Sequence, residues 1–265
     1  MKQVLLAVFL CGVQWAQAAQ VVRRDVFSPA MGRIIATILV VPETKTGAGF
    51  NTVYVLHGYS GNPQRTLDQD VPALKERADR EQTIFVMPDG SFSSWYINSP
   101  VRKNSQYETF VGVELVKYVD THFSTRKAAT HRGLLGWSMG GYGTMLIGTQ
   151  HPETFGILGS VCGALDFRTF GKDYQVNDML GEDTLTWRPY VMVNRIAWFE
   201  NNPQKLILDC GTEDPFIGMN RAFHQLLTSR GIPHEYIERQ GKHDTAYWAA
   251  AMEVQLDYFK HFFEQ

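Results

Sequence analysis

The chain has 265 residues, of which 44% are hydrophobic and 20% charged, and its formal net charge at pH 7 is -2. This length and apolar content suit one large α/β domain or two small ones, and they argue against intrinsic disorder. Because Lys and Arg are not in excess, little is available to neutralise a phosphate backbone, so nucleic acid is not an expected partner.

The N-terminus has the layout of a secretory signal peptide. A lysine precedes an apolar run of about ten residues, Val4 to Val13, and Ala16-Gln17-Ala18 matches a small-residue cleavage site. We therefore expect residues 1–18 to be removed by cleavage after Ala18, and the mature chain, 19–265, to be secreted or periplasmic. A buried first helix is the alternative. No internal apolar run reaches the roughly 18 residues that a membrane span needs.

After this segment, strand-like and helix-like stretches alternate. A β-hairpin is predicted from 20–27 and 34–41, and the later strands are apolar on both faces, which is typical of a buried parallel sheet. The alternation predicts a mostly parallel sheet with helices on both faces. A long insert at 166–202 is expected to shape the substrate site. The other strands are expected at 52–56, 83–87, 133–135, 156–161, 205–208 and 234–238, and the helices at 70–80, 108–122, 139–149, 218–229 and 245–263.

The clearest chemical signal is Gly136-Trp137-Ser138-Met139-Gly140. This G-x-S-x-G pattern, between a predicted strand and a predicted helix, is typical of a nucleophile elbow, in which glycines permit a sharp turn of the backbone. A structural turn serine is the alternative. A serine nucleophile needs a base, and the base needs an acid to orient it.

Of the downstream histidines, only His243 lies in a loop directly after the last predicted strand, where it can approach the elbow; an exposed position at a helix start is the alternative. The acid is expected at or after the end of the strand near Asp209. We favour Asp214, with Glu213 and Asp209 as alternatives. Asp244 is instead predicted to cap the last helix.

Two backbone N–H groups are needed to stabilise a developing oxyanion. We expect them from Met139, after the nucleophile, and from Tyr59 in the loop that follows the strand 52–56. His57 in that loop is expected to support it by packing and hydrogen bonding.

Aromatic side chains are candidates for a substrate cleft, although core packing explains each one equally well. Cys162 and Cys210 either form a disulfide or remain buried thiols. No spacing of ligands indicates a metal, and no phosphate-binding or dinucleotide motif appears, so no metal and no organic cofactor is expected. The aromatic candidates are Trp95, Tyr96, Tyr107, Trp187 and Trp198.

Six motifs follow one another along the chain: His57-Gly58-x-x-Gly61, Met87-Pro88-Asp89-Gly90, the stretch from Tyr107 to Phe123, Gly136 to Gly143, Cys210 to Asp214, and Lys242-His243-Asp244. In this order the chain resembles the esterase-D-like hydrolases, which include feruloyl and acetyl-xylan esterases of carbohydrate esterase family 1, S-formylglutathione hydrolases and mycolyltransferases. The resemblance implies an α/β-hydrolase fold without a cofactor, and a triad of Ser138, Asp214 and His243. Because the triad candidates come from loops between Ser138 and His243, we expect residues 19–265 to form a single α/β-hydrolase domain. The predicted signal peptide departs from the S-formylglutathione hydrolases, which resemble cytosolic enzymes.

The sequence thus predicts a secreted serine esterase acting on a small ester or an acylated polysaccharide. Feruloyl or acetyl groups on plant polysaccharide are the favoured substrate. A short-chain aryl esterase, an S-formylglutathione hydrolase-like enzyme and an acyltransferase to a sugar are alternatives within enzymes. A carbohydrate-binding protein without catalysis is the alternative from another class.

Overall fold

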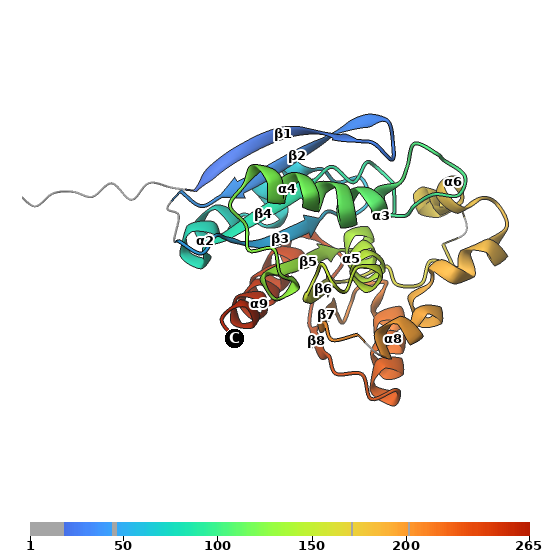
Figure 1. The fold of residues 1–265 in the computed structure, drawn as a ribbon. Helices are drawn as coiled ribbons and strands as arrows, with labels where there is room; N and C mark the ends of the chain where they lie inside the picture. The colour runs from blue at the N-terminus through green and yellow to red at the C-terminus, as the bar shows by residue number, and fades with distance from the viewer. Residues whose placement is uncertain (1–18, 44–46, 171, 201) are drawn as a thin grey trace, which may run out of the picture.

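The fold is built on an eight-stranded sheet in the order β1-β2-β4-β3-β5-β6-β7-β8 (Figure 1). The computed structural model describes residues 19–43, 47–170, 172–200 and 202–265, so the predicted signal peptide lies outside the described residues. The strands from β3 onward are mutually parallel, and β2 pairs antiparallel with β1 and β4. The strands are β1 (Gln20–Ser28), β2 (Arg33–Val41), β3 (Asn51–Leu56), β4 (Thr83–Pro88), β5 (Arg132–Trp137), β6 (Ile157–Val161), β7 (Lys205–Gly211) and β8 (Glu235–Arg239).

The central strands are buried along their whole length, and this accounts for their continuous apolar sequences. Every residue of β3, β4, β5 and β6 is buried, as expected for parallel strands covered on both faces. The hairpin of β1 and β2 is confirmed, with Gln20 opposite Val41 and Ser28 opposite Arg33. The outermost strands differ, because charged residues are exposed on both β1 and β8.

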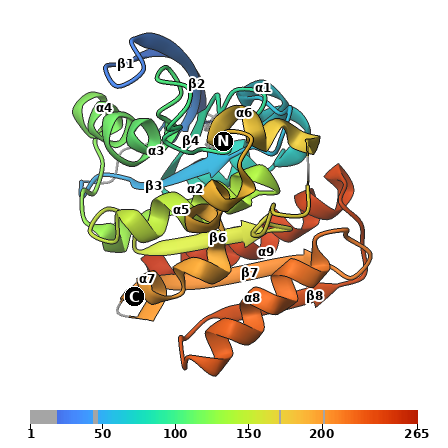
Figure 2. The same ribbon diagram turned by 90° about the vertical axis from the view of Figure 1, so that its right-hand side faces the viewer.

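Two layers of helices cover the sheet and produce two apolar clusters (Figures 1 and 2). One face is packed by α2 and α9, and the other by α4, α5 and α8. This architecture confirms the predicted α/β class. The helices on these faces are α2 (Leu74–Glu81), α4 (Val116–His122), α5 (Met139–Gln150), α8 (Ile217–Ser229) and α9 (Thr245–Phe263).

Two predicted helices differ from the structure in detail. The helix expected from residue 70 begins at Leu74, because the chain first forms α1 (Pro63–Arg65) and the π-helical turn η1 (Thr66–Asp70). That turn ends at Val71, whose φ of -141° is not helical. The helix expected at 108–122 is present, but its middle part is π-helical. It consists of α3 (Tyr107–Thr109), η2 (Phe110–Leu115) and α4.

The predicted insert forms short helices between β6 and β7 at the right of Figure 1, in yellow to orange. Its segments are held by local caps and by apolar residues such as Trp187 and Phe199, which are buried. The insert therefore adds to the core on the same side as α5 and α8. Its helices are η4 (Asp173–Gln175), α6 (Val176–Leu180), η5 (Thr184–Tyr190), η6 (Met192–Arg195) and α7 (Ala197–Glu200).

Candidate active site

The strand order places the candidate site at the carboxyl ends of β3 and β5. From β3 the chain moves to β4 on one side, and β5 then pairs on the other side of β3. In open α/β sheets, ligands bind where the strand order reverses in this way, because the loops diverge and leave a crevice. The loop after β3 carries Tyr59, and the turn after β5 carries Ser138.

Ser138 lies on a strained turn between β5 and α5. Its φ of 55° and ψ of -120° are rarely adopted by residues other than glycine. The backbone N–H of Ser138 donates to the carbonyl of Val161 at 2.9 Å. A Cβ on Gly136 would lie 2.5 Å from the backbone of Gly140, and a Cβ on Gly140 would lie 2.0 Å from the carbonyl oxygen of Leu56. Both glycines are therefore required by close backbone contacts.

Three side chains from separate loops form one hydrogen-bonded chain. Nε2 of His243 lies 2.9 Å from Oγ of Ser138, and Nδ1 lies 2.6 Å from Oδ2 of Asp214. Because a carboxylate only accepts, Nδ1–H donates to Asp214, and this leaves Nε2 free to accept the serine proton. The other carboxylate oxygen accepts from the N–H of Phe216 at 2.7 Å. The structure thus brings together the nucleophile, base and acid expected from the sequence.

The environment of His243 favours its charged form. Burial alone lowers the pKa of the imidazole, but the hydrogen bond to Asp214 and the contact with Cys162 outweigh it and raise the pKa to about 9. The ring is held between Phe216 and Trp248, whose ring centroids lie 4.7 and 5.1 Å away. An imidazolium that forms during a reaction is therefore stabilised in place.

The two alternative acids have other partners. Asp209, at the end of β7, accepts from the hydroxyl of Tyr247 at 2.5 Å and pairs with Arg239. Glu213 lies 4.0 Å from Nζ of Lys242 at the surface. Asp244 caps α9 as predicted, because its carboxylate accepts from the N–H of Tyr247 at 2.9 Å.

The loop after β3 is held by His57. Nε2 of this buried side chain accepts from the N–H of Gly90 at 2.8 Å, so Nδ1 carries the proton and donates to the carbonyl of Gly58 at 2.8 Å. This confirms the predicted supporting role. The backbone N–H groups of Tyr59 and Met139 donate no hydrogen bond to any part of the chain that the structure describes.

The pocket above Ser138 contains one of the five predicted aromatic residues, Trp95. The other four do not line it. Tyr96 and Trp187 are buried, with their polar atoms bonded to the carbonyls of His57 (3.2 Å) and Gly181 (2.9 Å). Burying a large ring in the core stabilises the fold, and sequence does not separate that role from pocket lining.

The remaining two aromatic residues lie away from the pocket as well. Tyr107 is buried and hydrogen-bonded to Arg33. Trp198 is exposed on α7, where the guanidinium of Arg195 lies 4.0 Å from the ring centroid. The guanidinium of Arg195 packs on one side of the Trp198 ring by a cation–π contact, and the other side can remain in water.

Sequence reasoning missed most of the pocket wall. Phe216 and Trp248 come two and five residues after Asp214 and His243, and this proximity to the triad loops is the signal that could have found them. Tyr174 comes from the predicted insert, and Arg65 and Asp70 come from the segment after β3, which carries no motif. The missed lining residues are Gly58, Gly61, Arg65, Asp70, Trp137, Tyr174, Pro215, Phe216 and Trp248.

Cys162 and Cys210 are both free and buried, so the thiol alternative is confirmed. A hydrogen bond to Cys210, together with burial, raises the pKa of Cys162 and keeps it protonated. Donor atoms of Cys162, Asp214 and His243 lie within 4.8 Å of one another. Two of these three already bond to each other in the triad.

Comparison with known proteins places the fold and the family. A family model described as "Putative esterase" matches residues 28–259. An acetyl esterase of Caldicellulosiruptor saccharolyticus is 26% identical over 215 residues, covering 74% of this chain and 78% of that protein. Esterase MT1326 of Mycobacterium tuberculosis (strain CDC 1551 / Oshkosh) is 28% identical over 238 residues; these cover 78% of this chain but 51% of that longer protein.

A solved ferulic acid esterase superposes with a TM-score of 0.79 at 22% identity, covering 92% of this chain and 98% of that one. This likeness shows the α/β-hydrolase fold. Among the described residues, no helix has the length and apolar character needed to cross a membrane.

Proposed function

The chain belongs to this esterase family and is an esterase of the serine hydrolase type; we propose that Ser138, His243 and Asp214 are its nucleophile, base and acid. The observation that carries the proposal is the pair of hydrogen bonds around His243, 2.9 Å to Ser138 and 2.6 Å to Asp214. This geometry matches the roles that nucleophilic acyl transfer requires.

In the proposed reaction, Oγ of Ser138 attacks the ester carbonyl carbon while Nε2 of His243 takes the hydroxyl proton. The N–H groups of Tyr59 and Met139 stabilise the negative charge that develops on the carbonyl oxygen. Their lack of partners among the described residues supports this role. Collapse of the intermediate releases the alcohol, which receives the proton from His243. Water then cleaves the acyl-enzyme by the same steps and releases the carboxylic acid.

For the substrate, we infer an ester with a hydroxycinnamoyl (feruloyl) or acetyl acyl group on plant polysaccharide, cleaved by an exported enzyme. The aromatic lining of the pocket supports the larger acyl group, because Tyr59, Trp95, Tyr174 and Phe216 all line it and aromatic rings pack favourably against one another. The predicted signal peptide supports export. Sequencing the N-terminus of the exported protein tests cleavage, and Ala19 is the expected first residue.

The acyl preference is tested with two esters of the same alcohol, methyl ferulate and methyl acetate. Burial of a phenyl ring is worth about 1.5–3 kcal/mol, so we expect kcat/KM to be roughly ten- to a hundredfold higher for the ferulate. A higher value for the acetate would instead favour an acetyl esterase. Turnover of acetylated xylan, measured beside a short-chain aryl acetate, separates a polysaccharide substrate from a small one.

A further inference from the structure

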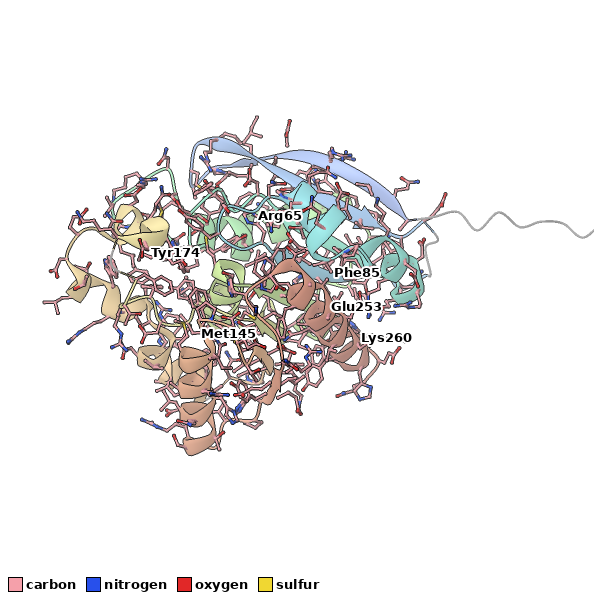
Figure 3. All side chains as sticks on the ribbon, turned by 180° about the vertical axis from the view of Figure 1, so that it is seen from behind. Arg65, Phe85, Met145, Tyr174, Glu253 and Lys260 are labelled. Carbon is pink, nitrogen blue, oxygen red and sulfur yellow. The ribbon has the colours of Figure 1, made fainter. Side chains whose placement is uncertain are left out.

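The pocket has two chemically different halves. Tyr59, Tyr174 and Phe216 form a connected aromatic half, with ring centroids 5.4 Å apart for Tyr59 and Tyr174 and 6.5 Å apart for Tyr174 and Phe216. Arg65 and Asp70, which also line the pocket and lie 3.4 Å apart, form a charged half. Figure 3 labels Arg65 on the helical segment after β3 and Tyr174 on the insert, well apart in that view.

Arg65 has unused hydrogen-bonding capacity. Its guanidinium carries five N–H donors, and one of them, from Nη2, donates to Oγ1 of Thr245 at 3.3 Å. Nε lies 3.4 Å from Oδ1 of Asp70 but makes no hydrogen bond to the described residues, although it is buried. The side chain is 36% exposed, so its free edge remains accessible from the pocket.

Asp70 is a weak partner for this charge. Its side chain is 1% exposed, and burial raises the pKa of the carboxyl more than the neighbouring Arg65 lowers it. Oδ1 of Asp70, the atom nearest to Arg65, also accepts from the hydroxyl of Thr245 at 3.5 Å. The guanidinium of Arg65 therefore keeps N–H donors that Asp70 does not occupy and that are suited to an anion.

The charged half adjoins the segment that carries the proposed base. Thr245, which Arg65 contacts, follows two residues after His243, and Trp248 of the same helix packs on the ring of His243. In the proposed reaction, His243 passes its proton to the leaving oxygen, so the remainder of the alcohol is released toward these residues.

We propose that Arg65 binds a carboxylate carried by the leaving alcohol, so that the enzyme prefers esters of acidic alcohols, such as hydroxy acids or uronic acid units, over esters of neutral alcohols. The guanidinium recognises a carboxylate through paired, charge-assisted N–H···O bonds. This inference deepens the proposed function and rests on it.

The test uses two acetate esters with the same aromatic alcohol skeleton, 4-acetoxybenzoate and its methyl ester, which lacks the charge. The measured quantity is the ratio of kcat/KM for the anionic ester to that for the neutral one. In Arg65→Gln we expect this ratio to fall at least about tenfold, the loss typical of a hydrogen bond to a charged group. Arg65→Lys should retain part of the preference, because it keeps the charge but not the fork.

Two further variants separate recognition from general effects. Arg230→Gln changes the net charge equally, at an exposed residue paired with Glu200 on the surface, and should leave the ratio within twofold of wild type. Asp70→Asn removes the competing carboxylate and should raise the ratio above wild type. A purely structural role of Arg65 would lower both rates together and leave the ratio unchanged, which would overturn the inference.

Failure of the proposed function is distinguishable from failure of this inference. If wild-type protein cleaves neither ester and Ser138 does not react with a fluorophosphonate, the triad assignment fails and the inference fails with it. If wild type cleaves both esters but the ratio does not respond to Arg65 or Asp70, the inference alone is wrong.

Discussion

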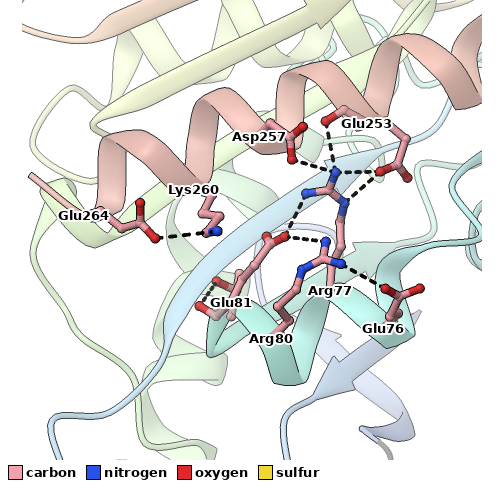
Figure 4. Close-up of polar contacts among 9 residues, drawn as sticks. Glu76, Arg77, Arg80, Glu81, Glu253, Asp257, Lys260 and Glu264 are labelled. Carbon is pink, nitrogen blue, oxygen red and sulfur yellow. Dashed lines mark hydrogen bonds and ion pairs between the residues drawn. The ribbon is translucent and has the colours of Figure 1, made fainter.

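Arg65 and Arg77 are close in sequence, but their guanidinium groups differ in exposure and in the number of their partners. Arg77 in α2 is 3% exposed, and its guanidinium contacts Glu81 at 2.7 Å, Glu253 at 2.5 Å and Asp257 at 2.8 Å (Figure 4). The side chain of Arg65 is 36% exposed, and its guanidinium donates one hydrogen bond to the described residues. A saturated guanidinium joins two helices, whereas an unsaturated one beside a pocket remains available to a ligand.

The backbone around the two arginines also differs, being regular near Arg77 and strained near the pocket. Near Arg77, regular helices α2 and α9 are joined across one face of the sheet (Figure 4). Near the pocket, Ser60, Trp95 and Ser138 have positive φ values of 59°, 54° and 55°. Backbone strain of this kind persists where surrounding contacts enforce it, and it concentrates at functional sites. We therefore expect changes at the pocket to affect rate and changes at the α2–α9 contact to affect stability.

The largest expected effect is on rate, in Ser138→Ala. If Ser138 is the nucleophile as proposed, kcat for an aryl acetate should fall about a millionfold, as in other triads. The free energy of unfolding, measured by urea denaturation, should stay close to wild type. Retained hydrolysis would show that another residue carries the chemistry.

Asp214→Asn should lower kcat about ten-thousandfold near neutral pH, because Nδ1 of His243 loses the acceptor that orients the ring. It should also change the pH profile. The wild-type rate should fall as pH drops through the raised pKa of His243, about 9, since the protonated ring cannot accept the serine proton. Without the carboxylate, the hydrogen bond and the charge of Asp214 that raise this pKa are lost, so the acidic limb should move to lower pH. An unmoved limb would assign it to another group.

Arg77→Ala tests the other region and should change stability with little change in rate. The substitution leaves the carboxylate of Glu81, which is 4% exposed, without its closest cation. Breaking a buried pair costs about 3–5 kcal/mol in free energy of unfolding, and we expect the lower end, about 3 kcal/mol, because Arg80 remains 3.1 Å from Glu81. Thermal denaturation should therefore show a midpoint lower by roughly 10 °C, with kcat/KM at 25 °C within twofold of wild type.

A matched control with the smallest expected effect lies on α9. Lys260 and Glu264 are 3.8 Å apart, with side chains 41% and 59% exposed. Lys260→Ala should cost less than about 0.5 kcal/mol, because water screens the pair. If Lys260→Ala lost as much stability as Arg77→Ala, the number of buried contacts would not explain the larger contribution expected of Arg77.

The sequence predicted the elements, and it pointed to the three residues that the structure brings together, because their signals are local. Gly136 and Gly140 mark the turn by the space they leave for the backbone, and the loop position after a strand distinguishes His243 from the other downstream histidines. The apolar runs of β3 and β5 predicted a buried parallel sheet for the same reason. Each of these features depends on neighbours within a few residues.

The pocket wall could not be predicted in this way. Trp95 and Tyr96 are adjacent in sequence, but only Trp95 lines the pocket. Which of the two buried rings reaches the pocket depends on contacts with the insert. One of these is the hydrogen bond from Nε1 of Trp95 to the carbonyl of Tyr174, at 2.9 Å. Arg65 likewise carries no local mark that separates it from Arg77, since the partners of Arg77 on α9 are more than 170 residues away.

The open sheet also bears on how the protein behaves at high concentration. Its two edges, β1 and β8, expose unpaired backbone groups that another molecule could extend. Both edges carry charge, however, with Arg23, Arg24 and Asp25 on β1 and Glu235 and Glu238 on β8. Charged side chains oppose edge-to-edge pairing. Fibrillar association should therefore require that the buried central strands first become exposed, and solution conditions that preserve the fold should also keep the molecules apart.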